Sequence, residues 1–468
     1  MATLALASWA TNLTYANLTP SVVDAAVKSV YNWAGCAIGG YGQDAPQIAL
    51  HTTLPFFGGH ATSSILGSNG SSKGSTFGEG FGVFADAQVA ALVNGIASHV
   101  DDYDDTHLET IIHPAGVVAS ALLAVAEAAA EAGWKEGPIS GRDFLTAFVA
   151  GVEAECKLGL AVSPEHYDAG WHITSTAGSV GAAVAVGRLL GLPTAAMQHA
   201  IGVAATQVVG MQEFFGSMTK SFHVGRAAQG GLLAALLARN GYTGSLQALE
   251  ARYGWTHVVS TRENATAYFA ELGRDGKWEI ERNTFKPFPC GIVMHPTIDG
   301  CIQLRRQASG EGKDVGAVRS VELRVNPHVL VLTGKTDPQT GLEGKFSIYH
   351  AAAVGLLYGE ATPSQFTDAV VMDRTVIAMR QKVHVATDEG VSDDQAYVSI
   401  TFEDGDTLEK HIEHAVGSLE NPLAEADLKK KFMDQVSKQI GEVRAERAYK
   451  AFTNIGNMTD IGKIRMLY

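Results

Sequence analysis

The sequence is poor in cysteine and in charged residues. Its 468 residues include four cysteines, Cys36, Cys156, Cys290 and Cys301, and no two of them form a CxxC pair. Few, scattered cysteines in a chain of this length exclude a disulfide framework and favour a reducing, cytoplasmic location. Charged residues make up 18% of the chain and hydrophobic residues 46%, so we expect a large buried core.

Segments and motifs that mark several large classes of protein are also missing. No uninterrupted apolar run reaches the roughly 18 residues of a membrane span, and the N-terminal segment lacks a basic start followed by a long apolar stretch. GxGxxG after a strand, GxxxxGK[ST] and HExxH are absent. The string GSSKG at 70–74 matches GxSxG, but its turn-rich surroundings lack the strand–elbow–helix context, so we do not expect Ser72 to be a nucleophile.

Positive charge is scarce as well. Lys and Arg number 35 against 49 Asp and Glu, a net charge of −14. This balance argues against nucleic acid and anionic membranes as partners. It leaves a small anionic substrate possible, because a pocket can be locally basic inside an acidic protein.

Helical patterns dominate the first part of the sequence. Thr19 followed by Pro20 marks a helix start, and apolar segments at about 84–98, 115–132, 142–160, 175–190, 194–209 and 224–239 predict buried helices. From about 279 the pattern changes, with strands expected at 318–325, 382–387 and 396–413 around a helix near 345–359. We therefore predict a mainly α fold: a large helical domain from 1–278 and 415–468, and a smaller α+β lid domain, 279–414.

One acidic stretch, HVDDYDDTHLETIIHP at 99–114, lies between two apolar helices. It is open to three interpretations: a solvated loop, a metal site, or an acid/base centre. The acids match no dedicated metal-ligand spacing, so we expect no metal. His113 precedes Pro114 at a helix start, where the helix dipole favours a neutral imidazole and a nearby carboxylate opposes that effect. Such a histidine is suited to proton transfer near neutral pH.

Three further polar clusters occur at or near helix starts. His166 and His172 precede one Ala/Val-rich helix, and Lys220, His223 and Arg226 open another. Lys220 and His223 are three residues apart, so they share a face if that turn is helical. The segment FKPFPCGIVMHPTIDG at 285–300 adds Lys286, Cys290 and His295, of which Cys290 is expected to be inert. Together the clusters could form one cationic pocket that moves protons.

These clusters resemble hallmarks of the MmgE/PrpD family. HVDDYDDTHLETIIHPAG is similar to its His-x-x-Asp-aromatic-Asp-Asp-Thr segment followed by His-Pro, and GWHITSTAGSVGAAVAVGRLLGL, GSMTKSFHVGRAAQGGLLAALLA and GLEGKFSIYHAAAVGLL resemble three other motifs. The resemblance covers essentially the whole chain. It implies a helical domain made from both chain ends, a smaller lid, a homodimer, and catalysis without metal or organic cofactor. The pocket residues that it implies are Asp102, Thr106, His113, His172, Lys220 and His295.

The family resemblance favours a lyase acting on a small di- or tricarboxylate such as cis-aconitate or 2-methylcitrate. We assign His113 and His172 to proton transfer and Asp102 to orientation. Lys220 and His223 are assigned to carboxylate binding, and Thr106 and His295 join the substrate-binding set. An epimerase of an imino- or amino-dicarboxylate such as iminodisuccinate, and a non-catalytic carboxylate-binding protein, remain as alternatives.

Overall fold

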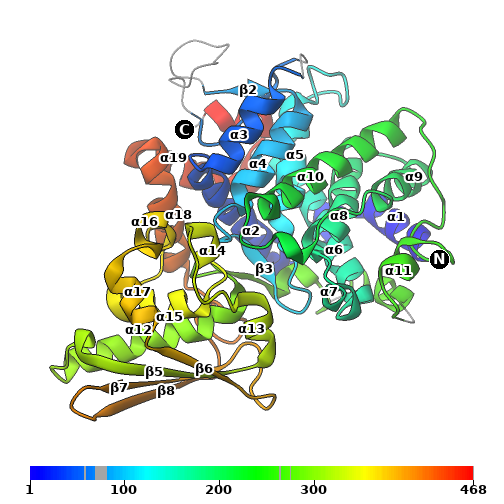
Figure 1. Ribbon diagram of the computed structural model, residues 1–468. Helices are drawn as coiled ribbons and strands as arrows, with labels where there is room; N and C mark the ends of the chain where they lie inside the picture. Colours follow the sequence, from blue (N-terminus) through cyan, green and yellow to red (C-terminus); the bar gives the residue numbers. More distant parts are fainter. Residues whose placement is uncertain (57–59, 69–81, 263–264, 275, 467–468) are drawn as a thin grey trace.

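The computed structural model of the chain is predominantly helical, which confirms the predicted fold class (Figure 1). The structure describes residues 1–468 except 57–59, 69–81, 263–264, 275 and 467–468. Ser72 and the GSSKG string therefore lie outside the described residues.

The larger of two main hydrophobic cores is formed by helices from both ends of the chain. Its helices are α1 (Ala2–Asn12), α2 (Pro20–Gly40), α3 (Asp44–Thr53), α4 (Ala87–His99), α5 (Pro114–Ala128), α6 (Gly141–Val162), α7 (Glu165–Asp168), α8 (Ile173–Leu190), α9 (Thr194–Ala205), α10 (Met218–Arg239), α11 (Trp255–Val259), α18 (Glu425–Ile440) and α19 (Glu442–Thr453). The last two pack against α2, so the chain returns to its first helices at its end (Figure 1).

Local sequence signals explain where several of these helices begin. The hydroxyl of Thr19 accepts a hydrogen bond from the Val22 amide, and Pro20 is the first residue of α2, as predicted. Helix α8 is long and apolar enough to cross a membrane, but 89% of its residues are buried inside the protein. It packs against α5, α6 and α10, so its apolar surface is covered by other helices.

The smaller core lies between a four-stranded sheet and a layer of helices. The sheet order is β6 (Val383–Thr387), β5 (Val318–Val325), β7 (Ala396–Phe402), β8 (Thr407–Ile412), with β5 and β6 parallel and the other neighbours antiparallel. The helices of this part are α12 (His295–Gly310), α13 (Pro327–Thr333), α14 (Gly341–Gly344), α15 (Ile348–Tyr358), α16 (Asp368–Val371) and α17 (Arg374–Arg380). The three predicted strand segments are confirmed, and the last is the β7–β8 hairpin.

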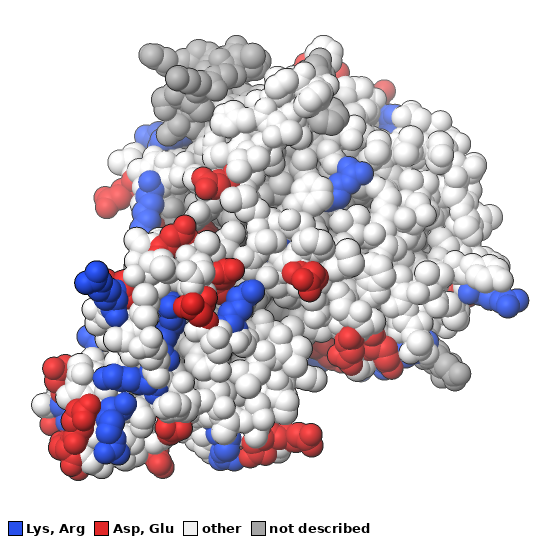
Figure 2. All heavy atoms as spheres, in the orientation of Figure 1, with Lys and Arg blue, Asp and Glu red and all other residues white. Residues whose placement is uncertain are grey.

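Two short strand pairs were not predicted. One joins β1 (Ser63–Ser64) to β2 (Phe84–Ala85), and the other joins β3 (Asp105–His107) to β4 (Asn283–Phe285). Strand β3 lies inside the acidic stretch, so the β3–β4 pair fixes that stretch to the segment that leads into the smaller core. In Figure 2, charges of both signs mix over the smaller part of the molecule, while the visible face of the helical part is mostly uncharged.

Helices α4 and α10 approach each other closely at two glycines. A Cβ atom on Gly95 would lie 2.6 Å from the Cα of Gly225, and one on Gly225 would lie 2.2 Å from the carbonyl oxygen of Leu92. Helix α4 ends at His99 and α10 carries Lys220 near its start. The glycine contact therefore sets the spacing of two elements that carry polar residues.

We predict that Gly225→Ala lowers the free energy of unfolding by about 1–3 kcal/mol, because a methyl group forced into a packed contact separates the helices. Chemical denaturation measures this change. Gly310→Ala is the control, since no heavy atom lies within 4 Å of a Cβ at that helix end. Equal stability of the two variants would show that the α4–α10 contact does not constrain the fold.

Candidate active site

The acidic stretch is a tightly held connection between α4 and α5. Helix α4 ends at His99, and His113 is the N-cap of α5, with Pro114 as first helical residue, as predicted. Among the described residues, the two non-glycine residues with positive φ are Asp102 (50°) and Ile111 (60°), and both belong to this connection. Such backbone strain concentrates at functional sites, where the surrounding structure holds it in place.

The acids of this stretch are buried, so the solvated-loop interpretation is wrong for four of them. Asp101, Asp102, Asp104 and Asp105 are all buried, and only Glu109 is exposed, in an ion pair with Arg282. One oxygen of Asp105 accepts hydrogen bonds from the amide of Ala115 and the side chain of Asn283. Asp105 therefore caps α5 and also holds β4.

Lysines from distant parts of the chain neutralise the buried acids. Lys220 and Lys286 donate to the same oxygen of Asp102, Oδ1, at 2.6 and 2.9 Å. Lys345 donates to the backbone carbonyl of Asp101 at 2.9 Å. Burial by itself raises the pKa of Asp102, but the two ammonium groups outweigh it and hold that pKa well below its usual range. Asp102 is thus an ionised carboxylate clamped between two cations.

The hydrogen bonds of His113 fix its tautomer. Its Nδ1 lies 2.7 Å from the backbone carbonyl of Asp105 and 3.2 Å from the hydroxyl of Thr106. Because a carbonyl only accepts, Nδ1 carries the hydrogen, and Nε2 of the neutral ring has a free lone pair. Burial lowers the pKa of His113 to about 3, with Asp104 opposing the shift. At neutral pH this imidazole is therefore uncharged, and its Nε2 is a hydrogen-bond acceptor.

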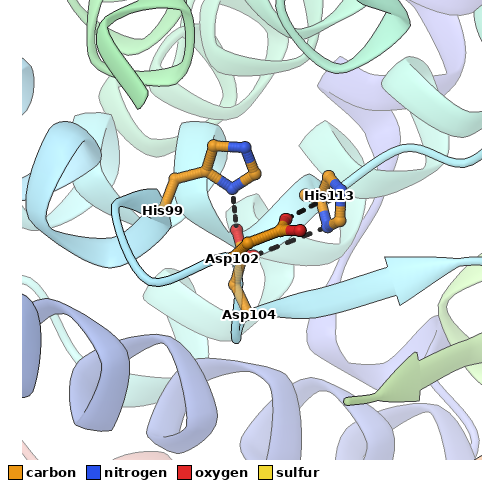
Figure 3. A group of neighbouring side chains, drawn as sticks. All are labelled: His99, Asp102, Asp104 and His113. Carbon is orange, nitrogen blue, oxygen red and sulfur yellow. Dashed lines mark hydrogen bonds and ion pairs between the residues drawn. The ribbon is translucent and has the colours of Figure 1, made fainter. Parts of the chain in front are cut away.

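A second histidine shares a carboxylate with His113 (Figure 3). His99 Nδ1 donates to Asp104 Oδ2 at 2.7 Å, and the other oxygen of Asp104 lies 3.5 Å from His113 Nδ1. Burial would raise the pKa of Asp104, but the two imidazoles outweigh it and lower that pKa below its usual range. Asp104 therefore stays ionised between two rings whose centroids are 4.8 Å apart.

His172 and His223 form a buried pair. His172 is the N-cap of α8, and its Nδ1 lies 3.0 Å from Nδ1 of His223 on α10. One of these nitrogens carries the hydrogen and the other accepts it, so the contact disfavours two imidazolium ions. Burial lowers the pKa of both rings, that of His223 to about 4.

These groups surround a cavity between the two parts of the molecule, with an empty volume, mouth included, of about 420 Å³. The helical part contributes charged and ring-bearing side chains, and the smaller part closes the cavity with mainly apolar ones. The lining residues are Asp102, Ile111, His113, Tyr167, His172, Phe215, Lys220, Lys286, Gly291, Ile292, Val293, Leu332, Thr333 and Phe346.

The structure brings four of the seven predicted site residues to the cavity wall: Asp102, His113, His172 and Lys220. The other three lie behind the wall. Thr106 contacts His113, and His223 contacts His172. His295 is buried, its ring packs on Phe288, and it is not part of the lining. These three are not among the residues that line the cavity, so their part in substrate binding stays a prediction.

The predicted role of Asp102 also changes. We expected it to orient His113, but the carbonyl of Asp105 does so, and Asp102 Oδ1 is 4.0 Å from His113 Nε2. Asp102 instead holds Lys220 and Lys286 in place. Lys286 and Lys345 are site lysines that the sequence prediction did not include. The signals that could have pointed to them are the shared segment of Lys286 with His295 and the place of Lys345 inside GLEGKFSIYHAAAVGLL, a motif of the family resemblance.

The carboxylates and histidines are close enough together to bind a cation. His99, Asp102, Asp104 and His113 each offer one ligand atom, and these atoms lie within 4.8 Å of one another. However, Asp102 Oδ1 already accepts from two ammonium groups, and Asp104 Oδ2 from His99. A divalent ion would have to use the second oxygens, Asp102 Oδ2 and Asp104 Oδ1, where the ammonium groups of Lys220 and Lys286 on the same Asp102 carboxylate repel a further cation. The residues therefore fit an ion-paired site better than a metal centre.

Comparison with known proteins places the chain among enzymes. The MmgE/PrpD N-terminal domain model matches residues 4–267 and the MmgE/PrpD C-terminal domain model matches residues 288–456. Cis-aconitate decarboxylase of Homo sapiens is 28% identical over 81% of this chain and 78% of its own length. Its namesake in Aspergillus terreus is 25% identical over 97% and 93%.

A 2-methylcitrate dehydratase of Salmonella typhimurium is also similar, at 25% identity over 35% of this chain and 34% of its own length. The two family models together span most of the chain and meet between the two hydrophobic cores. The chain belongs to the MmgE/PrpD family.

Proposed function

We propose that this protein is a lyase that decarboxylates a small unsaturated tricarboxylate such as cis-aconitate, without metal or organic cofactor. The observation that carries the proposal is the cavity in which Lys220 and Lys286 converge on Asp102 beside the neutral imidazoles of His113 and His172. The alignments with the cis-aconitate decarboxylases cover most of the chain, whereas the alignment with the 2-methylcitrate dehydratase covers about a third of it. This difference favours decarboxylation over dehydration.

The charges around the cavity suit a polycarboxylate. Two ammonium groups share one carboxylate, so the local sum of Lys220, Lys286 and Asp102 is one positive charge. A substrate carboxylate can pair with the free N–H groups of Lys220, and a charge-assisted hydrogen bond of this kind is worth roughly 1.5–3 kcal/mol. Phe215 and Phe346 cover Lys220 and restrict water, which strengthens these contacts.

The imidazoles supply neutral hydrogen-bonding groups. The Nε2 lone pair of His113 is free, since Nδ1 donates to the backbone, so this ring can accept a hydrogen bond from a bound carboxylic acid. His172 also lines the cavity, and its Nδ1 is engaged by His223. Its Nε2 accepts or donates according to which ring of the pair carries the shared hydrogen. Loss of carbon dioxide leaves an electron pair on carbon beside the remaining carboxylates, and the lysines stabilise that charge.

The reaction can be identified by NMR in deuterated buffer with a panel of polycarboxylates, using protein treated with EDTA. We expect cis-aconitate to release carbon dioxide, with one deuterium entering the product carbon. Alkene formation from 2-methylcitrate without carbon dioxide would instead establish a dehydratase. Deuterium exchange without net change would indicate an epimerase. Loss of activity on chelation, restored by one divalent ion, would contradict the ion-paired interpretation of the site.

We predict that His113→Gln lowers kcat by about ten- to hundredfold, because it removes the Nε2 lone pair that can hold a substrate carboxylic acid in the cavity. Glutamine keeps a polar side chain but does not place an acceptor atom on a rigid ring at that point. His107→Gln is the matched control from the same segment, because His107 bonds Thr110 and Glu279 and does not line the cavity. That change should lower the melting temperature and leave kcat nearly unchanged. If both variants keep full turnover, His113 is structural.

A further inference from the structure

A second, smaller cavity lies on the other side of Lys220. It shares Asp102, Lys220 and Phe346 with the substrate cavity, so these three side chains form the partition between the two spaces. Its other lining residues are His99, Val100, Gly216, Ser217, Ser221, Leu342 and Lys345. Ser217 is exposed, whereas Lys220 and His99 are buried, so the space leads from the surface toward the buried ammonium group.

Two residues that line this second cavity carry an unsatisfied buried atom, Asp102 at Oδ2 and His99 at Nε2. His99 donates through Nδ1 to Asp104, while its Nε2 is fully buried and has no hydrogen-bond partner among the described residues. The neutral ring thus presents a lone pair that a water molecule could satisfy. A buried water typically makes two to four hydrogen bonds, and the ammonium groups of Lys220 and Lys345 line the same space.

The two lysines of the substrate cavity differ in how fully they are bonded. Lys286 Nζ has three acceptors: the carbonyl of Asp102 at 3.3 Å, Asp102 Oδ1 at 2.9 Å and the carbonyl of Cys290 at 3.1 Å. Lys220 Nζ has one within the described residues, Asp102 Oδ1, and otherwise lies between the aromatic faces of Phe215 and Phe346. Lys220 therefore keeps N–H groups that can point into either cavity.

Decarboxylation needs a proton donor in addition to a place for the carboxylates. Replacing a carboxylate by hydrogen consumes one proton per turnover, whereas dehydration and epimerisation consume none. Burial lowers the pKa values of His99, His113 and His172, so these rings are neutral near pH 7 and have no proton to spare. The remaining protonated groups at the cavity are the phenol of Tyr167, whose pKa is raised by burial, and the two ammonium groups. The phenol is the weaker acid, and of the two ammonium groups only Lys220 has uncommitted hydrogens.

We propose that Lys220 is the proton donor of the reaction and that the second cavity holds the water from which Lys220 is recharged. This inference rests on the proposed decarboxylation. The carbon–carbon bond to the departing carboxylate breaks, and its electron pair stays on the substrate. A Lys220 N–H bond then breaks and a C–H bond forms, which leaves a neutral amine. A proton from solvent reaches that amine through the water in the second cavity, and His99 Nε2 orients this water.

The electrostatic surroundings of Lys220 support a donor role. Burial lowers the pKa of Lys220 from its ordinary range, while Asp102 opposes the shift. A lowered pKa makes an ammonium group a better acid near neutral pH. The protonated form is the active one, so kcat should fall as pH rises through this pKa. The titratable groups that face Lys220 from the surrounding elements are Asp102, Asp104, His99, His113, Tyr167, His172, His223, Lys286, Cys290 and Lys345.

Lys220→Arg separates proton donation from carboxylate binding. Arginine keeps the positive charge and its hydrogen bonds, but its pKa above 12 prevents it from giving up a proton. We expect kcat with cis-aconitate to fall by about 10²-fold or more, KM to change by only a few-fold, and the basic limb of the pH profile to disappear. A kcat within a few-fold of the wild type would overturn the proposal and leave Lys220 as a binding residue.

Lys220→Ala provides a second test of proton donation if the larger arginine side chain does not fit the site. Methylamine should restore kcat in a saturable manner, because it supplies an ammonium group that can donate. Potassium ion brings a positive charge but no proton, so it should not restore kcat. Equal rescue by both, or rescue by neither in a protein whose circular dichroism matches the wild type, would contradict proton donation by Lys220.

The water route is tested by filling the second cavity. Ser221 lines this cavity but not the substrate cavity, and its hydroxyl bonds only the Met218 carbonyl within its own helix. Ser221→Leu should lower kcat about tenfold and increase the solvent deuterium isotope effect with KM unchanged, because proton supply becomes limiting. Ser217→Ala is the control, since it removes a hydroxyl at the mouth without filling the space.

The outcomes separate the two proposals. If wild-type protein releases no carbon dioxide from cis-aconitate, the proposed function fails before the variants are compared. If the wild type does so and Ser221→Leu matches it in kcat and isotope effect, the second cavity is not the proton route.

Discussion

The structure depends on the balance of charge around one buried connection. Four carboxylates between α4 and α5 are removed from water, which is costly unless each has partners. Asp104 is bonded by His99, and Asp105 by Asn283. The lysines that hold this connection come from four separate places: Lys220 on α10 and Lys286 after β4 bind the Asp102 carboxylate, Lys345 after α14 binds Asp101, and Lys431 on α18 donates to the Tyr103 carbonyl. The helical part, the smaller part and the C-terminal helices must therefore all be in place before the site is electrically balanced. This requirement ties assembly of the fold to assembly of the cavity.

The same balance decides what chemistry the cavity can perform. Histidines that are buried beside ammonium groups stay neutral, and the positive charge remains on lysine. Asp102 is saturated on one oxygen by two lysines, and its other oxygen has no partner. The strained backbone at Asp102 keeps this arrangement where a substrate carboxylate can approach. The site is therefore a positively charged pocket in which Asp102 is the counter-ion of Lys220 and Lys286.

Local signals in the sequence were sufficient for much of the fold. Proline after a capping residue located the starts of α2 and α5, and alternating residues located β5 and β7. Long-range partners could not be predicted, because Asp102 and Lys286 are 184 residues apart and Tyr103 and Lys431 are 328 apart. For the same reason the pairing of β3 with β4, and the burial of the acids that depends on it, went unpredicted. The homodimer and the cytoplasmic location remain predictions.

The most direct test of this account removes the counter-ion. Asp102→Asn leaves Lys220 and Lys286 as two buried ammonium groups without their shared carboxylate, and breaking such a pair typically costs about 3–5 kcal/mol. Thermal unfolding is measured with and without propane-1,2,3-tricarboxylate, an unreactive tricarboxylate. The account predicts a lower melting temperature for the variant alone and a larger rise on adding the ligand than in the wild type. A variant that melts like the wild type and gains no more from the ligand would contradict it.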